Sequence, residues 1–382
     1  MTKPPRLIPF PAPREPLSLL AVDRAVSDLR RGRAVAVRGS NGTASLVEAA
    51  EATTPQSLAA MAAASRSQPR LAITARRAAV LALSPGGFKV VTVAVEGGLT
   101  AELVRDLCNP LSRLPAPPPL ALTVAEAPAY ACDSAAVLLT KTARLLPAAV
   151  TAAIRDQAAE DLDAWAVRHG FLLVDAGDVF QYEHTAARTL RPVSEARVPL
   201  RGAEDARIVA FRPHDGGLEH LAVVLGSPRA EDAVLTRLHS ECFTGDLLGS
   251  LRCDCGDQLR GAIAEISAAG GGLLLYLAQE GRGIGLVNKL RAYELQDRGF
   301  DTIDANEQLG FDADERVYLP AAQMLRQLGF DRVRLLTNNP AKVAGLTRCG
   351  ITVEKRVPHA FPSNQHNETY MRTKAGRGGH LF

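Results

Sequence analysis

The chain has 382 residues, enough for two domains with full hydrophobic cores, and its 47% hydrophobic and 22% charged residues are typical of a globular protein. Its 44 basic and 41 acidic residues nearly balance, which argues against a nucleic-acid or membrane partner. We find no signal-peptide core and no apolar run near the about 18 residues of a membrane span, so we expect a cytoplasmic protein with reduced thiols.

The first half of the chain, residues 1–190, is predicted to form an α/β domain. Residues 34–37 and 89–95 have the apolar, β-branched character of buried strands. A helix is expected over 54–64, with a threonine as its cap and a proline at its first position. The proline-rich segment 114–119 is predicted to be a surface loop.

The second half, residues 191–382, is predicted to form an α+β domain with functional loops. Short apolar strands are expected at 272–277 and 332–336, and a helix at about 318–328. Glycines and paired charges lie between these elements, as they do in loops that carry binding residues. The expected fold class is therefore α/β and α+β in two domains.

A cluster of cysteines in the second half predicts a metal site. Cys242, Cys253 and Cys255 fall within fourteen residues with the spacing C-x10-C-x-C. Three thiolates can hold zinc and leave a fourth position for water, although a closed structural site completed by His239 remains an alternative. A disulfide between the second and third cysteines would be strained. The other cysteines are interpreted as core or surface thiols: Cys108, Cys132 and Cys349.

Three more segments carry groups suited to an anionic substrate. Glycines alternate in 279–285, where backbone amides could approach a phosphate beside Arg282, although a plain turn is the alternative. Asp314 and Arg316 lie in an expected loop, where a carboxylate can accept a proton and a guanidinium can bind phosphate. In 335–342 a strand leads into an Asn-Pro helix start that could face an anion.

Taken together, these segments resemble GTP cyclohydrolase II, the zinc enzyme that opens the pathway to riboflavin. The resemblance rests on His-Ser-Glu-Cys-Phe-Thr-Gly-Asp at 239–246, Ser-Leu-Arg-Cys-Asp-Cys-Gly at 250–256 and Gln-Glu-Gly-Arg-Gly-Ile-Gly-Leu at 279–286. Shorter motifs follow in the family's order at 288–293, 296–297, 304–306, 309–311, 313–316 and 335–340. The match runs from about residue 193 to 382, about half of the chain.

The resemblance implies a role for each matching residue. Cys242, Cys253 and Cys255 match the ligands of one zinc ion per chain, with water as the fourth. Asp314 matches the proton acceptor, Arg316 the nucleophile toward the α-phosphate, and Tyr293 a tyrosine at the reaction centre. The positions that match GTP contacts are Arg237, Leu238, His239, Ser240, Glu241, Gln258, Glu280, Gly281, Arg282, Thr302, Thr337 and Lys342. A homodimer, and Mg2+ accompanying GTP, are also expected.

Two places depart from the family pattern. Leu277 and Ala278 stand where many members have His-Arg, and Asp257 stands where an apolar residue or proline is common. None of them matches a ligand or catalytic position, so the departures bear only on affinity and rate.

The first half resembles 3,4-dihydroxy-2-butanone-4-phosphate synthase over about residues 22–190, on segments 25–37, 49–62 and 168–182. Where that family has a dense acidic loop for Mg2+, this chain has Arg-Gly-Ser-Asn-Gly-Thr at 38–43, without a carboxylate. We therefore expect an inactive synthase-like domain ahead of a GTP cyclohydrolase II domain. The alternatives are a bifunctional enzyme with an active synthase, and a non-catalytic GTP-binding regulator with structural zinc.

Overall fold

The computed structural model describes residues 14–40, 42–83, 86–112, 121–156 and 161–368, together with 372, 375–377, 379 and 381. The loop predicted at 114–119, and Asn41 within the segment 38–43, lie outside the described residues.

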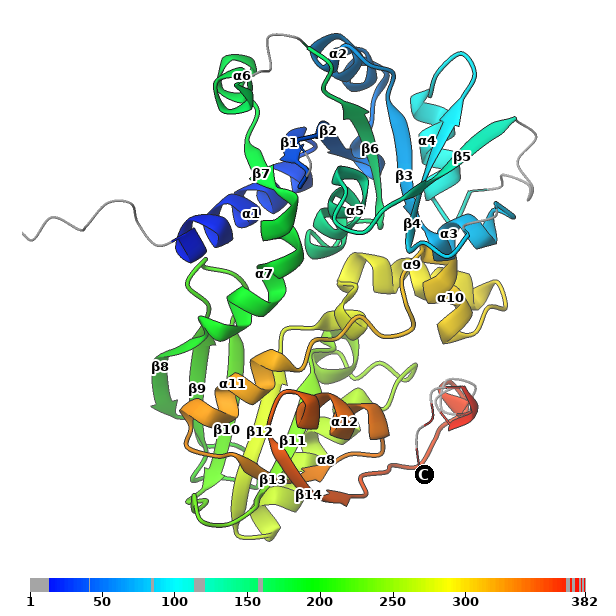
Figure 1. Cartoon of the computed structure of the whole chain (residues 1–382). Coiled ribbons are helices and arrows are strands. Elements are labelled where there is room, and N and C mark those ends of the chain that lie inside the picture. The colour runs from blue at the N-terminus through cyan, green and yellow to red at the C-terminus, as the bar shows by residue number, and fades with distance from the viewer. Residues whose placement is uncertain are drawn as a thin grey trace, which may run out of the picture.

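The first half of the described chain forms one mixed sheet with helices around it (Figure 1). Its strands are β1 (Val35–Arg38), β2 (Ala44–Ala49), β3 (Arg70–Thr74), β4 (Val90–Val95), β5 (Leu122–Ala127), β6 (Ala148–Ala153) and β7 (Leu173–Asp175). Its helices are α1 (Arg14–Arg30), the short η1 (Ala50–Ala52), α2 (Pro55–Ser65), α3 (Ala75–Val80), α4 (Ala101–Cys108), α5 (Cys132–Thr142), α6 (Leu162–His169) and α7 (Ala176–Arg188). The strand order is β5-β4-β3-β6-β2-β1-β7, antiparallel except for the parallel pair β1 and β7.

The second half forms another mixed sheet. Its strands are β8 (Arg191–Arg197), β9 (Arg207–Arg212), β10 (His220–Gly226), β11 (Val234–Ser240), β12 (Gly271–Leu277), β13 (Arg332–Leu336) and β14 (Thr352–Val357). Its helices and helical turns are η3 (Phe243–Leu247), α8 (Cys255–Ala268), η4 (Glu280–Gly283), α9 (Leu286–Asp297), α10 (Thr302–Leu309), α11 (Leu319–Gln327) and α12 (Pro340–Arg348). The order is β14-β13-β11-β12-β10-β9-β8, with the four strands from β14 to β12 parallel and the rest antiparallel.

The predicted fold class and elements are confirmed. β1, β4, β12 and β13 appear where strands were predicted, and α11 where a helix was predicted. Helix α2 begins with the predicted cap. The Thr54 side chain accepts a hydrogen bond from the Ser57 backbone N–H, and the Ser57 side chain accepts one from the Thr54 backbone N–H, which is a capping box. The apolar run in β12 is buried on both faces: Leu273 and Leu275 pack toward α11 and α12, and Leu274 packs toward α8.

One hydrophobic core cluster contains residues of both halves, although the halves have separate sheets. The core cluster that contains Leu71 and Ile73 of β3 also contains Leu295 of α9, Leu309 of α10 and the following Phe311. In Figure 1, α9 and α10 lie between the two sheets, directly beneath α3 and β4. Helices of the second half therefore pack as an integral layer of the first.

Candidate active site

The sequence motifs meet at one edge of the second sheet. Strand β11 pairs in parallel with both β12 and β13, so the segments that follow these three strands emerge side by side. Cys242 follows β11, the glycine-rich segment 279–285 follows β12, and Thr337 follows β13. This topology brings together residues that are up to about a hundred positions apart in the sequence.

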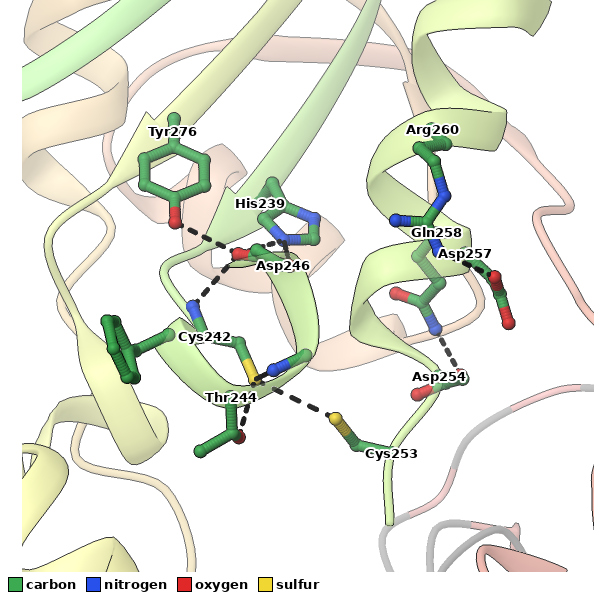
Figure 2. Close-up of polar contacts among 12 residues, drawn as sticks. His239, Cys242, Thr244, Asp246, Cys253, Asp254, Asp257, Gln258, Arg260 and Tyr276 are labelled. Atoms are coloured by element: carbon green, nitrogen blue, oxygen red, sulfur yellow. Dashed lines mark hydrogen bonds and ion pairs between the residues drawn. The ribbon is translucent and has the colours of Figure 1, made fainter. Parts of the chain in front are cut away.

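The three predicted ligand cysteines form a compact cluster. Their sulfur atoms lie within 4.8 Å of one another, and Cys242 Sγ is 3.7 Å from Cys253 Sγ (Figure 2). Tetrahedral zinc with Zn–S bonds of about 2.3 Å would hold its sulfurs about 3.8 Å apart, so this spacing fits the ion. The cysteines are free thiols, and Cys253 and Cys255 form no disulfide.

The pKa shifts of the three thiols also favour binding of a metal cation. Hydrogen bonds with Cys242 and Cys253, together with burial, raise the pKa of the Cys255 thiol well above its ordinary value. Hydrogen bonds from the other two thiols lower the pKa of Cys242. Three adjacent thiolates repel one another, so the trio ionises fully only when a metal ion offsets the charge.

A glycine leaves room for the sulfurs. A Cβ atom on Gly245 would lie 2.8 Å from Cys253 Sγ and 3.0 Å from Cys242 Sγ. The Gly245 backbone N–H donates a hydrogen bond of 3.3 Å to the Cys242 sulfur. The turn η3 is thus shaped around the thiol cluster.

His239 is held by a carboxylate and does not belong to the group of three cysteines that could hold a metal ion. Its Nε2 is 3.0 Å from Oδ1 of Asp246, whose other oxygen accepts hydrogen bonds from the Cys242 backbone and the Tyr276 hydroxyl (Figure 2). Burial lowers the pKa of His239 despite this carboxylate. In the described part of the chain, the group able to hold a metal contains the three cysteines without this histidine. The geometry favours the open site.

Lys289 is a site residue that the sequence analysis passed over. Its Nζ lies 3.0 Å from Cys242 Sγ, 3.0 Å from Thr244 Oγ1 and 2.9 Å from Glu280 Oε1. Burial opposes ionisation of the amine, but the Cys242 sulfur and Glu280 hold the pKa of Lys289 above its ordinary value. An ammonium therefore sits beside the sulfur cluster. Its place in the motif at 288–293 was the available signal.

Further cationic side chains line one cavity together with the three cysteines. Arg237 is 4% exposed and donates from Nη1 to the Leu336 carbonyl at 2.9 Å and from Nη2 to Gln258. Burial lowers the pKa of Arg237 to about 10, so it remains charged at neutral pH. Lys342 donates to the Leu238 carbonyl at 2.7 Å. Arg282, with φ of +62°, donates to the Ala313 carbonyl. These charges suit a polyanionic substrate.

Asp314 and Arg316 form a bidentate ion pair. Oδ1 of Asp314 lies 2.8 Å from Nε of Arg316, and Oδ2 lies 2.5 Å from Nη2. Burial opposes ionisation, but the hydrogen bonds and charge of Arg316 hold the pKa of the Asp314 carboxyl below its ordinary value.

Tyr293 lies beside Thr244, with its hydroxyl 3.4 Å from Thr244 Oγ1. Burial raises the pKa of this phenol to about 12.

One cavity collects nearly all of the predicted site residues. Those that line it are Arg237, His239, Ser240, Glu241, Cys242, Cys253, Cys255, Gln258, Glu280, Gly281, Arg282, Tyr293, Thr302, Arg316, Thr337 and Lys342. Asp314 is not among the lining residues and contacts the cavity through Arg316. The Leu238 side chain packs in the core, 1% exposed, so only its backbone is available to a ligand.

The cavity also has lining residues without a sequence prediction. Besides Lys289 they include Arg252, Gln296, Asn306, Asn338 and His359. His359 is buried, and its ring lies 2.9 Å from the Gln258 carbonyl and 3.2 Å from Glu265. A single histidine after the last strand gives no sequence pattern that would have identified it.

The departures from the family pattern lie outside the cavity lining. Asp257 forms a surface ion pair with Arg260 at 2.9 Å, with both side chains 62% exposed (Figure 2). Ala278 donates its backbone N–H to Nδ1 of His220 at 3.0 Å.

Comparisons with known proteins identify the family of the chain. The family model for GTP cyclohydrolase II matches residues 191–358. The GTP cyclohydrolase-2 of Azospirillum brasilense is 55% identical over 370 residues, covering 97% of this chain and 96% of the relative. The GTP cyclohydrolase-2 of Xylella fastidiosa strain 9a5c is 37% identical over 377 residues, covering 97% of this chain and 89% of the relative.

Among solved structures, the crystal structure of RibBX, a two-domain 3,4-dihydroxy-2-butanone 4-phosphate synthase from A. baumannii, covers 83% of this chain and 93% of its own. Its sequence identity is 19% and its TM-score is 0.37. The assignment of the family rests instead on the sequence relatives, whose similarity extends over nearly the whole chain. The chain belongs to the GTP cyclohydrolase II family.

Proposed function

We propose that the chain is a zinc-dependent GTP cyclohydrolase II. It would hydrolyse GTP to 2,5-diamino-6-(5-phosphoribosylamino)pyrimidin-4(3H)-one, formate and pyrophosphate, the first step of riboflavin biosynthesis. The observation that carries the proposal is that the three clustered thiols and the cations Arg237, Arg316 and Lys342 line the same cavity. A metal site beside a polycationic wall suits a nucleoside triphosphate that is hydrolysed at its base and at its phosphates.

Opening the imidazole ring requires water to add at C8 and a ring C–N bond to break. Zinc held by Cys242, Cys253 and Cys255 would supply the Lewis acidity for this addition. Tyr293, with its raised pKa, keeps its proton at neutral pH and can donate a hydrogen bond to charge that develops on the ring. The Lys289 ammonium offsets part of the negative charge of the three sulfurs.

Release of pyrophosphate is a separate displacement at the α-phosphorus. We assign the nucleophile to Arg316 and the proton acceptor to Asp314, because the carboxylate contacts two nitrogens of the guanidinium. The carboxylate can take the proton that the guanidinium loses as the N–P bond forms and the P–O bond to pyrophosphate breaks. Water would then attack the same phosphorus and break the N–P bond, which releases the monophosphate and restores Arg316. Arg237, Arg282 and Lys342, with Mg2+ on the phosphates, would offset the triphosphate charge.

The remaining GTP contacts are proposed from the resemblance and from their place in the cavity: His239, Ser240, Glu241, Gln258, Glu280, Gly281, Thr302 and Thr337. Leu238, which does not line the cavity, is proposed from the resemblance alone and through its backbone.

The direct experiment is incubation of purified, zinc-loaded protein with GTP and Mg2+, following formate, pyrophosphate and the pyrimidine. Cys253→Ser is expected to lose both zinc, measured by metal analysis, and formate release. Cys349→Ser, which changes a thiol that is not part of the cluster, is the matched control. A Cys253→Ser protein that opened the ring at the normal rate would refute the proposal.

For the first half, residues 1–190, we propose no synthase activity. Arg38, at the start of the segment that lacks carboxylates, forms ion pairs with Asp163 at 2.8 Å and Asp175 at 3.4 Å. A cation bonded to both nearby carboxylates opposes binding of Mg2+ by them. These contacts disfavour the bifunctional alternative, and the catalytic groups gathered in the second half disfavour a regulator without catalysis.

We further propose a cytoplasmic homodimer. Large apolar side chains are exposed on η3 and the turn after it, at Phe243, Leu247, Leu248 and Leu251, and on α9, at Val287 and Leu290. Exposed apolar side chains of this kind suit contact with a second copy of the chain. Light scattering of the purified protein tests this: a dimer is expected, and Leu248→Asp should shift it toward monomer. No helix in the described residues has the length and apolarity needed to cross a membrane.

A further inference from the structure

The turn that ends α5 in the first half reaches the catalytic loops of the second. Arg144 has a φ of +59°, the left-handed conformation in which glycine is favoured. The backbone N–H groups of Arg144 and Leu145 donate to the carbonyls of Lys141 and Thr140, the two bonds of a Schellman motif. Glycine usually occupies this position, and a side chain there costs about 1 kcal/mol. An arginine in this unfavourable conformation suggests that its side chain makes contacts that offset the cost.

The side chain of Arg144 lies against both ends of the glycine-rich loop 279–285. Its Nη2 donates to the Ala278 carbonyl at 2.5 Å, just before the loop. Its stem covers Gly285 at the other end, where an added Cβ would lie 3.0 Å from Cβ and 3.1 Å from Cδ of Arg144. The Arg144 carbonyl accepts a hydrogen bond from the buried amide of Asn288, in the first turn of α9. The loop between these contacts carries Glu280, Gly281 and Arg282.

Lys141, one turn earlier, reaches the second catalytic loop. Its Nζ lies 2.6 Å from Oε1 of Glu315, the residue between Asp314 and Arg316. Glu315 also joins the two loops directly, because its backbone N–H donates to the Arg282 carbonyl at 3.1 Å. Both side chains of the Lys141 pair are only about one-fifth exposed, 20% and 22%. The end of α5 therefore fixes two loops that line the active site.

We propose that Arg144 and Lys141 are positioning residues for GTP hydrolysis, through which the first half of the chain holds the loops 279–285 and 312–316 in their catalytic arrangement. The first half is then a working part of the cyclohydrolase, whether or not it has chemistry of its own. The inference rests on the proposed function only for its kinetic readout. The geometry of the loops is measurable without substrate.

Arg144→Met removes the guanidinium and keeps most of the stem, and Arg144→Lys keeps a cationic donor. We expect the methionine variant to lower kcat by between about tenfold and a hundredfold, since small misplacements of catalytic groups have such effects. The KM for GTP and the unfolding temperature should change much less, and the lysine variant should recover most of the rate. Tyr182→Phe is the matched control, because it removes another bond between the halves, 2.7 Å to Asp215, in a segment without predicted site residues.

Amide hydrogen exchange gives a readout that does not depend on activity. Exchange in 279–285 and 312–316 should become faster in Arg144→Met and stay unchanged in Tyr182→Phe. If the methionine variant fails to fold, Arg144→Gly, which suits the positive φ, replaces it. Normal kcat and normal amide exchange in Arg144→Met, or in Arg144→Gly where it is used instead, would overturn the inference. The inference would also be wrong if kcat in the lysine and methionine variants fell only in proportion to a fall in their unfolding temperatures. If the wild-type protein released no formate, the proposed function would fail, and the exchange data would still decide this inference.

Discussion

The prediction that most directly tests the metal centre is Gly245→Ala, which alters the space around the sulfurs without removing a ligand. The new methyl carbon would lie 2.8 Å from Cys253 Sγ, 3.0 Å from Cys242 Sγ and 3.0 Å from Cys255 Cβ. Favourable contacts between carbon atoms begin near 3.5 Å, and sulfur is larger, so the neighbours must move apart by about 0.5 Å or more. Zinc–ligand distances tolerate only about 0.2 Å.

We therefore expect Gly245→Ala to weaken zinc binding by about tenfold to a hundredfold, the range seen when groups that support metal ligands are changed. The assay is competition for zinc with a chromophoric chelator, read together with the far-UV circular dichroism spectrum. Gly177→Ala in α7 is the matched control, since a Cβ there would meet no atom within 4 Å. Normal zinc affinity in Gly245→Ala would show that the sulfurs are not held in the geometry described here.

Three further predictions concern single residues and the first half of the chain. Arg316→Ala is expected to suppress pyrophosphate release strongly, because the proposed nucleophile is lost. A coupled phosphate assay measures this release, and a wild-type rate would show that Arg316 does not have that role. Burial and the charge of Arg144 lower the pKa of His220 to about 4 from its ordinary 6.5, so the unfolded chain binds a proton in this range and the folded chain does not. Stability should therefore fall by up to about 3 kcal/mol as the pH drops from about 6.5 to 4. His220→Asn, which keeps an acceptor for the Ala278 N–H, should reduce that slope in denaturant titrations, and an unchanged slope would contradict the assignment. The whole protein should form no dihydroxybutanone phosphate from ribulose 5-phosphate and Mg2+. Mass spectrometry checks this, and detection of dihydroxybutanone phosphate would show an active synthase.

The sequence alone was sufficient for the local structure and for selecting residues that the fold brings into one cavity. Strand β12 was predictable because its apolar run is continuous and short, which is typical of a strand that is buried on both faces. The start of α2 was predictable because its cap and its proline act within one turn of the chain. The cysteine spacing predicted a metal site because three thiols so close together can hold one ion jointly, and the fold brings their sulfurs within 4.8 Å of one another.

The tertiary structure decided which groups act on one another. No local pattern states that His239 bonds with Asp246, and so the sequence left closure of the metal site by this histidine open. The environment of Lys289 depends on where η3 packs against α9, which is a property of the fold.

The relation between the halves also lay outside the sequence patterns. A change in composition near residue 190 suggested two domains, and the sheets do divide there. One hydrophobic core cluster nevertheless contains residues of both halves, because α9 and α10 of the second half pack beneath the first sheet. Apolar periodicity reveals that a helix face is buried, and only the packing reveals which surface covers it. For that reason the contacts of Arg144 and Lys141 with the loops 279–285 and 312–316 became visible only in three dimensions.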